Sequence, residues 1–164
     1  MVKWLVIALV ALPVLLLLAG QMGLLRGQAP GNLGVREGKL KPPSKTPNSV
    51  SSQAALWPGH EQLAYANIAP LALVGSGPDA AANTLAKLQA LVQAMPGAAV
   101  VKAEAGYLYA TFTTPVLKFT DDVEFWFDPA AGVVQVRSAS RLGRKDFGVN
   151  RARVEAIAKR LHPA

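Results

Sequence analysis

Long apolar stretches and periodic apolar positions divide the chain into segments and predict its elements. The run WLVIALVALPVLLLLAGQMGLL extends without a charged residue from Trp4 to Leu25, between Lys3 and Arg26. Its 22 residues, at about 1.5 Å rise, reach roughly 33 Å as a helix, enough for a hydrocarbon layer of about 30 Å. The pattern therefore predicts that residues 1–26 are a transmembrane signal anchor or a signal peptide.

Two interpretations of this leader stay open on the sequence. A cleaved signal peptide has a shorter apolar core that ends in small residues, and Leu17-Leu18-Ala19-Gly20 matches that pattern poorly.

The orientation of the body is a separate question. The Lys and Arg residues that follow the run favour a body inside the cell. A short charged N-terminus before a long apolar run is typical of a signal anchor. We expect a membrane-anchored protein whose body is periplasmic or extracytoplasmic.

The composition changes after the leader. Residues 27–46 are rich in Gly, Pro, Lys, Ser and Asn, and Pro30, Pro42 and Pro43 cannot donate backbone hydrogen bonds. This composition predicts a linker that leads into a single globular domain at 47–164. His60 lies in an irregular part of that domain, and we interpret it as structural or solvated because His162 is far away in sequence.

Helical periodicity predicts two helices. Leu85, Leu88, Val92 and Met95 recur at spacings of three and four, after a capping-box-like Ser76-Gly77-Pro78-Asp79 and before Pro96-Gly97. A second helix is predicted to begin at Asn150 as its N-cap, with Val154, Ile157, Ala158 and Leu161 on one stripe. The opposite stripe of this helix carries Arg151, Arg153, Lys159 and Arg160.

Four strands are predicted between these helices, at 98–104, 107–114, 123–128 and 133–137, with hairpin turns at 105–106 and 128–132. In the third run Val123, Phe125 and Phe127 share one face, while Glu124 and Trp126 share the other. Trp126 therefore lies either on an exposed or ligand-facing surface or in a two-sided core that the aromatic side chains fill. The order of elements predicts an α+β two-layer sandwich, with two helices covering a four-stranded antiparallel sheet.

The chain has a formal net charge of +7 and contains no cysteine. Stability therefore cannot depend on disulfides. No phosphate-binding loop, metal-ligand cluster or catalytic triad can be read from the sequence, so we expect no cofactor and no metal. The basic residues gather toward the two ends of the chain. No nucleic-acid recognition motif accompanies them, and anionic lipid head groups suit an anchored domain better.

The segment from Arg137 to Arg141 is the first candidate for chemistry. Strand alternation places Arg137 and Arg141 on one face and Ser138 and Ser140 on the other. Guanidinium groups bind phosphate or carboxylate in bidentate fashion, and hydroxyls add donors. This arrangement predicts an anion clamp, unless the same arginines pair with the neighbouring aspartates and hold the loops in place.

Carboxylates and a compact loop surround that segment. Asp121 and Asp122 are adjacent in a strand and point to opposite faces, so only one of them reaches any given site. The loop LGRKDFGVN offers backbone amides that suit an anion before the last helix. No catalytic residue can be assigned. The candidate ligand-binding residues are Asp121, Asp122, Arg137, Ser138, Ser140, Arg141, Asp146, Asn150 and Arg151.

Three passages of the chain carry a resemblance to a known family: PNSVSSQ from Pro47, FTDDV from Phe119, and RSASRLGRKDFGVNRARVE from Arg137 to Glu155. They resemble the domain-of-unknown-function family 1499, small bacterial envelope and plastid proteins without an established activity. The resemblance covers about residues 40–162. It implies two cysteines beside the Pro-Asn pair, where this chain has Pro43 and Ser49. Gly143 and Gly148 also match the motif of the family. The resemblance implies no catalytic residue.

We therefore expect a non-catalytic domain that binds an anionic small molecule, a lipid head group or a partner protein of unknown kind. A hydrolase or transferase that uses one of the three aspartates with the two serines is one alternative. Serine chemistry lacks a histidine base nearby in the sequence. A purely structural domain, in which every arginine of the motif pairs internally, is another alternative.

Overall fold

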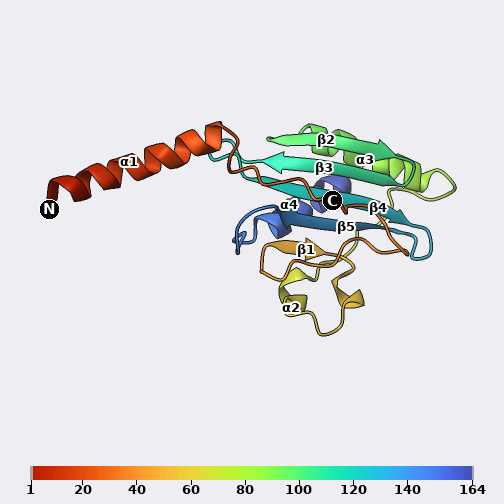
Figure 1. Cartoon of the computed structure of the whole chain (residues 1–164). Coiled ribbons are helices and arrows are strands. Elements are labelled where there is room, and N and C mark those ends of the chain that lie inside the picture. The colour runs from red at the N-terminus through yellow and green to blue at the C-terminus, as the bar shows by residue number, and fades with distance from the viewer. Residues whose placement is uncertain (1, 164) are drawn as a thin grey trace.

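Five antiparallel strands form one sheet in the order β1-β5-β4-β3-β2 (Figure 1). The computed structural model describes residues 2–163, apart from the side chain of Val6. The strands are β1 (Ser49–Ser51), β2 (Ala98–Glu104), β3 (Tyr107–Thr113), β4 (Thr120–Asp128) and β5 (Val133–Ser140). The helices are α1 (Val2–Gln21), α2 (Leu63–Ala66), α3 (Ala80–Gln93) and α4 (Val149–Leu161), with a 3-10 turn at Ala54–Leu56. The α+β class is as the pattern predicts.

The predicted number of strands is wrong, because β1 forms a fifth strand beside β5. Val50 pairs with Ser138, so a segment far away in sequence completes the edge of the sheet. β1 has only three residues, two of them serines, and therefore shows no apolar alternation to predict it. The third predicted strand begins three residues earlier, at Thr120, and the fourth continues to Ser140.

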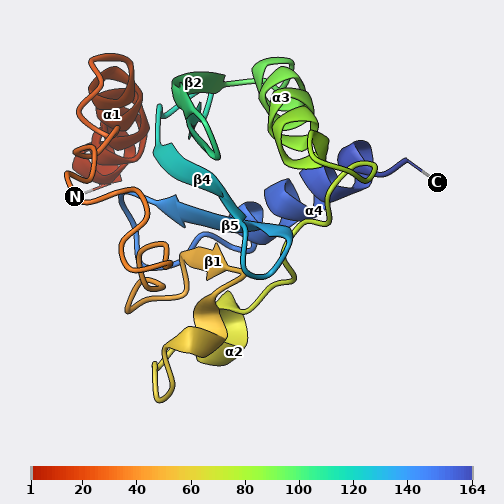
Figure 2. The same ribbon diagram turned by 90° about the vertical axis from the view of Figure 1, so that its right-hand side faces the viewer.

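Helices α3 and α4 cover one face of the sheet, as Figure 2 shows from the end of the strands. Leu88 and Val92 of α3, Ile157 of α4, and Val123 and Phe125 of β4 are all fully buried in one apolar cluster. Removal of this apolar surface from water, at roughly 25 cal/mol per Å², is the main force that holds the layers together. Gly97 joins α3 to β2 where a Cβ would lie 2.3 Å from the Thr113 carbonyl oxygen.

The opposite face of the sheet is covered by the segment between α1 and β1. Leu40 is 1% exposed and packs against Tyr107 and Tyr109. The Gly34 amide donates to Glu124 Oε1 at 2.7 Å, which fixes the segment to β4. The sequence predicts a linker over 27–46, and in the structure its part from Leu33 to Leu40 packs on the sheet as a further layer. Trp126 is half-buried against this layer, in agreement with the interpretation that the aromatic side chains fill a two-sided core.

Both predicted helix starts need correction. The Ser76 capping box does not form: α3 begins at Ala80, and its N-cap Asp79 makes no side-chain capping bond. Asn150 is not the N-cap of α4, because the helix begins at Val149 after Gly148. The carboxylate of Asp146 accepts the Gly148 and Asn150 amides at 3.1 and 3.0 Å, and so replaces the predicted cap.

Helix α1 extends away from the body as a separate arm (Figure 1). It is long and apolar enough to cross a membrane or to serve as a signal sequence, with a mean hydropathy of 2.6, and its most apolar part is not buried in the body. Its last turn touches the body, where the Gln21 amide donates to the Val116 carbonyl at 2.8 Å. Pro13 lies inside the helix.

Candidate functional site

The sheet separates the residues of the predicted cluster into two groups. Asp121 points to the face covered by α3 and α4, together with Ser138 and Ser140, as the strand alternation predicts. Asp122, Arg137 and Arg141 lie on the opposite face, under the segment that leads to β1. These groups therefore belong to two different environments.

On the helix face, a dense network joins β4 and β5 to α4. Arg153 Nη2 donates to Asp121 Oδ2 at 2.6 Å, and its Nη1 donates to Ser138 Oγ at 3.0 Å. Asn150 is fully buried: its side-chain amide donates to Ser140 Oγ at 3.0 Å and accepts a hydrogen bond from the Ser138 hydroxyl. The sequence places Arg153 on the outer stripe of the helix, which is wrong, because its guanidinium is directed to the nearly buried Asp121 carboxylate on β4.

Asp146 organises the loop that precedes α4. Tyr65 donates its hydroxyl hydrogen to this carboxylate, which also accepts the Asn150 side-chain amide at 2.8 Å. Burial raises the pKa of Asp146, but hydrogen bonds from Tyr65, Asn150 and Gly148 outweigh burial and hold the pKa below its ordinary value. Arg151 binds the Tyr65 carbonyl at 2.7 Å and so joins the same region to α2. These contacts hold the loop in one conformation.

On the opposite face, Arg141 and Asp122 form a nearly buried bidentate pair. Arg141 Nη2 and Nε lie 2.7 and 2.9 Å from the two carboxylate oxygens of Asp122. Tyr109 donates to Asp122 Oδ1 at 2.5 Å. Burial, together with the hydrogen bond to Asp122, raises the pKa of Tyr109 to about 12. Asp122 is thus saturated, and it neutralises the Arg141 guanidinium.

Arg137 and Glu124 lie beside this pair but are joined more loosely. Glu124 is fully buried and accepts the Tyr107 hydroxyl at 2.8 Å, while its Oε2 forms no hydrogen bond with the described part of the chain. Arg137 Nη1 lies 3.8 Å from that oxygen, too far for a hydrogen bond. Burial lowers the pKa of the Arg137 guanidinium, and the Glu124 and Asp122 carboxylates oppose this effect. Burial also raises the pKa of the Tyr107 hydroxyl, with the Glu124 charge acting in the same direction.

A cavity of about 340 Å³ opens beside Arg137, between β5 and the segment that covers it. Lys41, Lys45, Arg137 and Arg141 contribute four cationic side chains to its lining, against the single lining carboxylate of Asp122. Lys45 is exposed at the rim, and Lys41 Nζ donates to Asn32 Oδ1 at 2.8 Å. The cavity is therefore electropositive, with one arginine deep in its wall.

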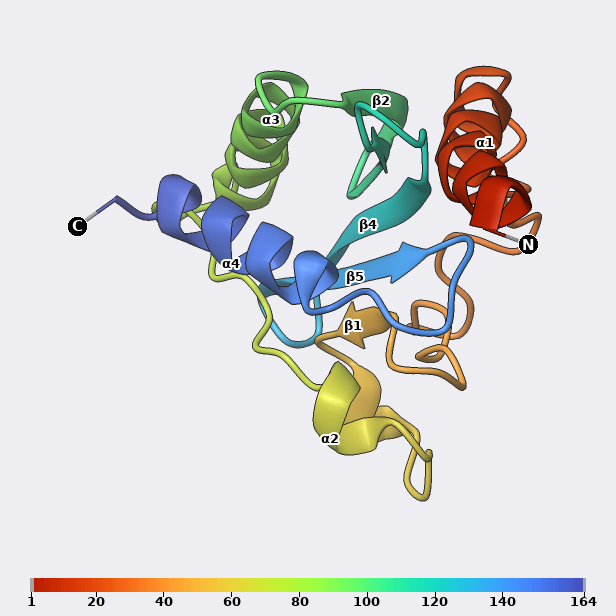
Figure 3. The same ribbon diagram turned by 90° about the vertical axis from the view of Figure 1, so that its left-hand side faces the viewer.

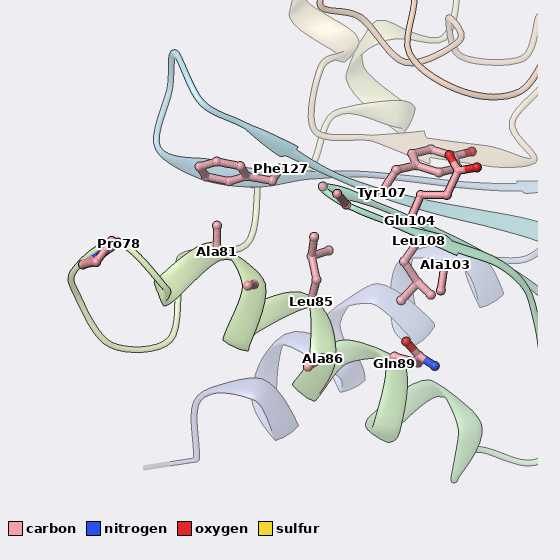
Figure 4. Close-up of a pocket in the computed structure, with 13 residues that line it drawn as sticks. Pro78, Ala81, Leu85, Ala86, Gln89, Ala103, Glu104, Tyr107, Leu108 and Phe127 are labelled. Atoms are coloured by element: carbon pink, nitrogen blue, oxygen red, sulfur yellow. The ribbon is translucent and has the colours of Figure 1, made fainter.

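A larger cavity lies elsewhere, between α3 and the β2–β3 hairpin, and has a volume of about 520 Å³ (Figure 4). Ala81 and Leu85 of α3 point toward strands that carry Leu108 and Phe127. Apolar side chains dominate this groove, and Glu104 is its ionisable acid. It offers no group of charges comparable to that of the smaller cavity.

Sequence reasoning missed several residues that complete these groups. Glu124 shares its strand face with Asp122, and Tyr107 and Tyr109 alternate in the same way along β3. This period of two was the available signal for placing them beside the arginines. Lys41 and Lys45 gave no such signal, because their position depends on how the segment before β1 folds back.

Comparison with known proteins gives one match. The family model described as a protein of unknown function (DUF1499) matches residues 39–161, which include all five strands and helices α2 to α4. No curated protein and no solved structure matches the chain. The matched range contains both charge networks and most of the electropositive cavity lining. On this match, the chain belongs to the DUF1499 family of proteins of unknown function.

Proposed function

We propose that this protein is a membrane-anchored binding domain that holds the phosphate or carboxylate group of an anionic ligand in the cavity beside Arg137. The observation that carries the proposal is the state of this arginine. Arg137 is only 4% exposed, and its Nε donates to the Pro42 carbonyl at 3.3 Å. Its two terminal nitrogens, however, form no hydrogen bond with the described residues. Such donors favour an anion that enters the cavity.

The other charges of the lining support the same ligand chemistry. Arg141 is neutralised by its pair with Asp122, whereas Lys41 and Lys45 have no carboxylate within salt-bridge distance among the described residues. A planar guanidinium deep in the wall suits bidentate binding of an oxyanion, and flexible lysines at the rim add charge. A free anionic metabolite and a lipid head group share this chemistry.

Helix α1 supports the anchored part of the proposal. Its apolar side chains are exposed to the surroundings, which is costly in water and favourable in a bilayer. With α1 as a signal anchor, the body lies on the periplasmic or extracytoplasmic side. A reporter fused to the C-terminus tests this topology, and a reporter that is active only in the cytoplasm would reject it.

The enzymatic alternative gains little from the geometry. Ser138 and Ser140 are hydrogen-bonded to the Asn150 amide rather than to a base, and Asp121 is bound by Arg153. His60 accepts the Gln62 amide in its own turn, and His162 lies beside the Ala72 carbonyl. Nucleophilic catalysis requires a base within hydrogen-bond reach of the nucleophile. We therefore propose binding without catalysis.

The test uses the full chain in detergent, with inorganic phosphate and glycerol phosphate as probes. The Lys41→Gln, Lys45→Gln double variant removes two rim charges without touching the core, and Lys159→Gln, Arg160→Gln is the matched control on the exposed face of α4. At a ligand concentration of 100 Kd, a single site raises the free energy of unfolding by about 2.7 kcal/mol. We expect this rim variant to bind the phosphate probes roughly tenfold more weakly, because each removed charge lowers the binding free energy by about 0.7 kcal/mol.

Native mass spectrometry of the chain as isolated identifies the source of the anion. A retained phospholipid indicates a head group, and a retained small anion indicates a free metabolite. The proposal fails if both probes leave the stability of the wild-type chain unchanged. It also fails if the rim variant and the α4 variant respond to the probes equally.

A further inference from the structure

Phe147 is the most exposed large apolar side chain of the body, with 93% of its surface open. Its backbone has a φ of +54°, a left-handed conformation that is unfavourable for a bulky residue. Gly148, the next residue, also has a positive φ, of +83°. The chain therefore accepts both backbone strain and an exposed aromatic ring at this position. Outliers of this kind cluster at functional sites.

The loop around Phe147 is fixed, so the exposed ring is not a consequence of a loose segment. Its neighbour Asp146 is buried and accepts hydrogen bonds from Tyr65 and from the Gly148 and Asn150 amides. These bonds tie the loop to α2 on one side and to α4 on the other. The ring is thus presented outward by a rigid support.

A second loop with exposed apolar residues lies at the same end of the sheet. Residue 121 pairs with residue 140, and the Arg141 amide donates to the Thr120 carbonyl at 3.1 Å. The loop 114–119 before β4 and the loop 141–148 after β5 are therefore neighbours. Their exposed apolar side chains are Val116, Phe119, Leu142 and Phe147, with exposed fractions of 57%, 37%, 41% and 93%.

The same two loops also carry positive charge. Lys118, Arg144 and Lys145 lie in the two loops. Asp146 is their one carboxylate, and it is occupied by its internal hydrogen bonds. Apolar side chains flanked by free cations are the combination that inserts into the head-group region of an anionic bilayer.

Helix α1 meets the body at this same end. The Gln21 side chain binds the Val116 carbonyl, and a Cβ on Gly20 would lie 2.8 Å from the Leu117 carbonyl oxygen. Figure 3, which looks from the side of α1, shows the helix and the loop between β5 and α4 on the near side of the body. An α1 that crosses a bilayer therefore brings both loops to the bilayer surface.

We propose that the loops 114–119 and 141–148 form a docking surface for an anionic bilayer, with Phe147 inserted into the interface and Arg144 and Lys145 at the lipid phosphates. The proposal rests on α1 as the membrane segment, which belongs to the proposed function. It does not depend on the cavity beside Arg137. Docking at two places, the anchor and the loops, orients the body and holds the opening of the cavity near the membrane.

The absence of cysteine makes a direct test possible, because one introduced cysteine carries a spin label without background labelling. Val149→Cys places the label two residues from an intact Phe147, at a half-exposed position. Ala130→Cys places the control label in the β4–β5 hairpin at the opposite end of the sheet. The full chain is reconstituted into nanodiscs of phosphatidylglycerol with phosphatidylcholine, and into nanodiscs of phosphatidylcholine alone.

We expect the label at position 149 to be more accessible to oxygen than to an aqueous nickel complex in anionic nanodiscs, and the label at position 130 to show the reverse. Phe147→Ser, combined with Val149→Cys, should make position 149 water-accessible. Arg144→Gln, Lys145→Gln should have the same effect at physiological salt, because it removes the attraction to lipid phosphates.

Several results would overturn the docking surface. One is a label at position 149 that is as water-accessible as the label at position 130 while the chain stays in the nanodisc. Another is protection that appears only with two chains per nanodisc, which would assign the surface to a second copy. A chain that leaves the nanodisc would reject the anchor and the docking together. Phosphate binding by the Phe147→Ser chain is measured separately and reports only on the cavity.

Discussion

On the face of the sheet under α3 and α4, Arg153 lies 2.6 Å from Asp121, whereas on the opposite face Arg137 lies 3.8 Å from Glu124. Both pairs are nearly buried, and both place an arginine against a carboxylate of β4. The terminal nitrogens of Arg153 donate hydrogen bonds to three oxygen atoms. The terminal nitrogens of Arg137 instead face a cavity. The first pair is held by close internal hydrogen bonds, whereas the second leaves guanidinium donors that the proposed anionic ligand would use.

The two faces of the sheet differ in what covers them. Helices α3 and α4 cover one face, and α4 brings Asn150 to satisfy the hydroxyls of β5. An irregular segment covers the other face with backbone groups and prolines, which leave space beside Arg137. A buried charge without a close partner is costly. Such a charge therefore marks the face on which function is to be sought.

The largest expected effect is on the helix face. Arg153→Ala leaves Asp121 buried without its cation, and we expect a loss of about 3 to 5 kcal/mol in the free energy of unfolding. Guanidinium denaturation of the full chain measures it. The double variant Arg153→Ala, Asp121→Ala should cost less than the sum of the single variants, because the unpaired charge is gone. Additive losses would show that the pair is not coupled.

The segment over the opposite face gives the next effect. Leu40→Ala removes a fully buried side chain between this segment and Tyr107, and we expect a cost of about 2 to 4 kcal/mol. Leu56→Ala, at a position that is 47% exposed, is the control and should change stability by less than about 0.5 kcal/mol. Equal effects of the two substitutions would mean that the segment is not part of the folded domain.

Asp146 gives a smaller effect that depends on pH. Its folded pKa lies below the ordinary value of 3.8, so it contributes stability above that pH and loses the contribution as pH falls through the lowered pKa. We expect Asp146→Asn to cost about 1 to 3 kcal/mol at pH 7, and progressively less as the pH falls below 3.8 and through the lowered pKa. Unfolding curves over a series of pH values from 7 downward measure the difference. A constant difference at every pH would contradict the assignment.

The smallest expected effect belongs to the cavity face. The double substitution Arg137→Met, Glu124→Gln removes both charges at similar volume, and we expect it to change stability by less than about 1 kcal/mol. The same variant should lose the stabilisation by phosphate that the wild-type chain shows. A loss of several kcal/mol without phosphate would instead make this pair a cohesive element, like the pair on the helix face.

Strong local periodicity accounts for the parts of the fold that the sequence predicts well. The alternation in β4 correctly separates Asp121 from Asp122, and the spacing of Leu88 and Val92 correctly identifies the buried face of α3. β1 was not predicted, because a strand of three residues is too short to show an alternation of apolar and polar positions. The start of α4 is misplaced because Asp146, rather than Asn150, satisfies the first amides.

The candidate site could be predicted only in part, for a related reason. Alternation places Arg137 and Arg141 on one face, but it cannot tell which carboxylate each will meet. Asp122 pairs with Arg141 although Arg137 lies on the same face, because the register of β4 on β5 decides the distances. The same uncertainty hid Arg153, whose partner is 32 residues away in sequence.

The sequence by itself determined the apolar leader, the helix and strand periods, the face to which each strand residue points, and the family motif. Only the tertiary structure decided that the segment after the leader covers the sheet, that Lys41 and Lys45 join Arg137 at a cavity, and that the loop between β5 and α4 lies on the same side of the body as α1. The physical reason is the range of the forces involved. Side-chain direction follows from local backbone geometry, whereas partners, cavities and shared surfaces depend on the packing of segments that lie far apart along the chain.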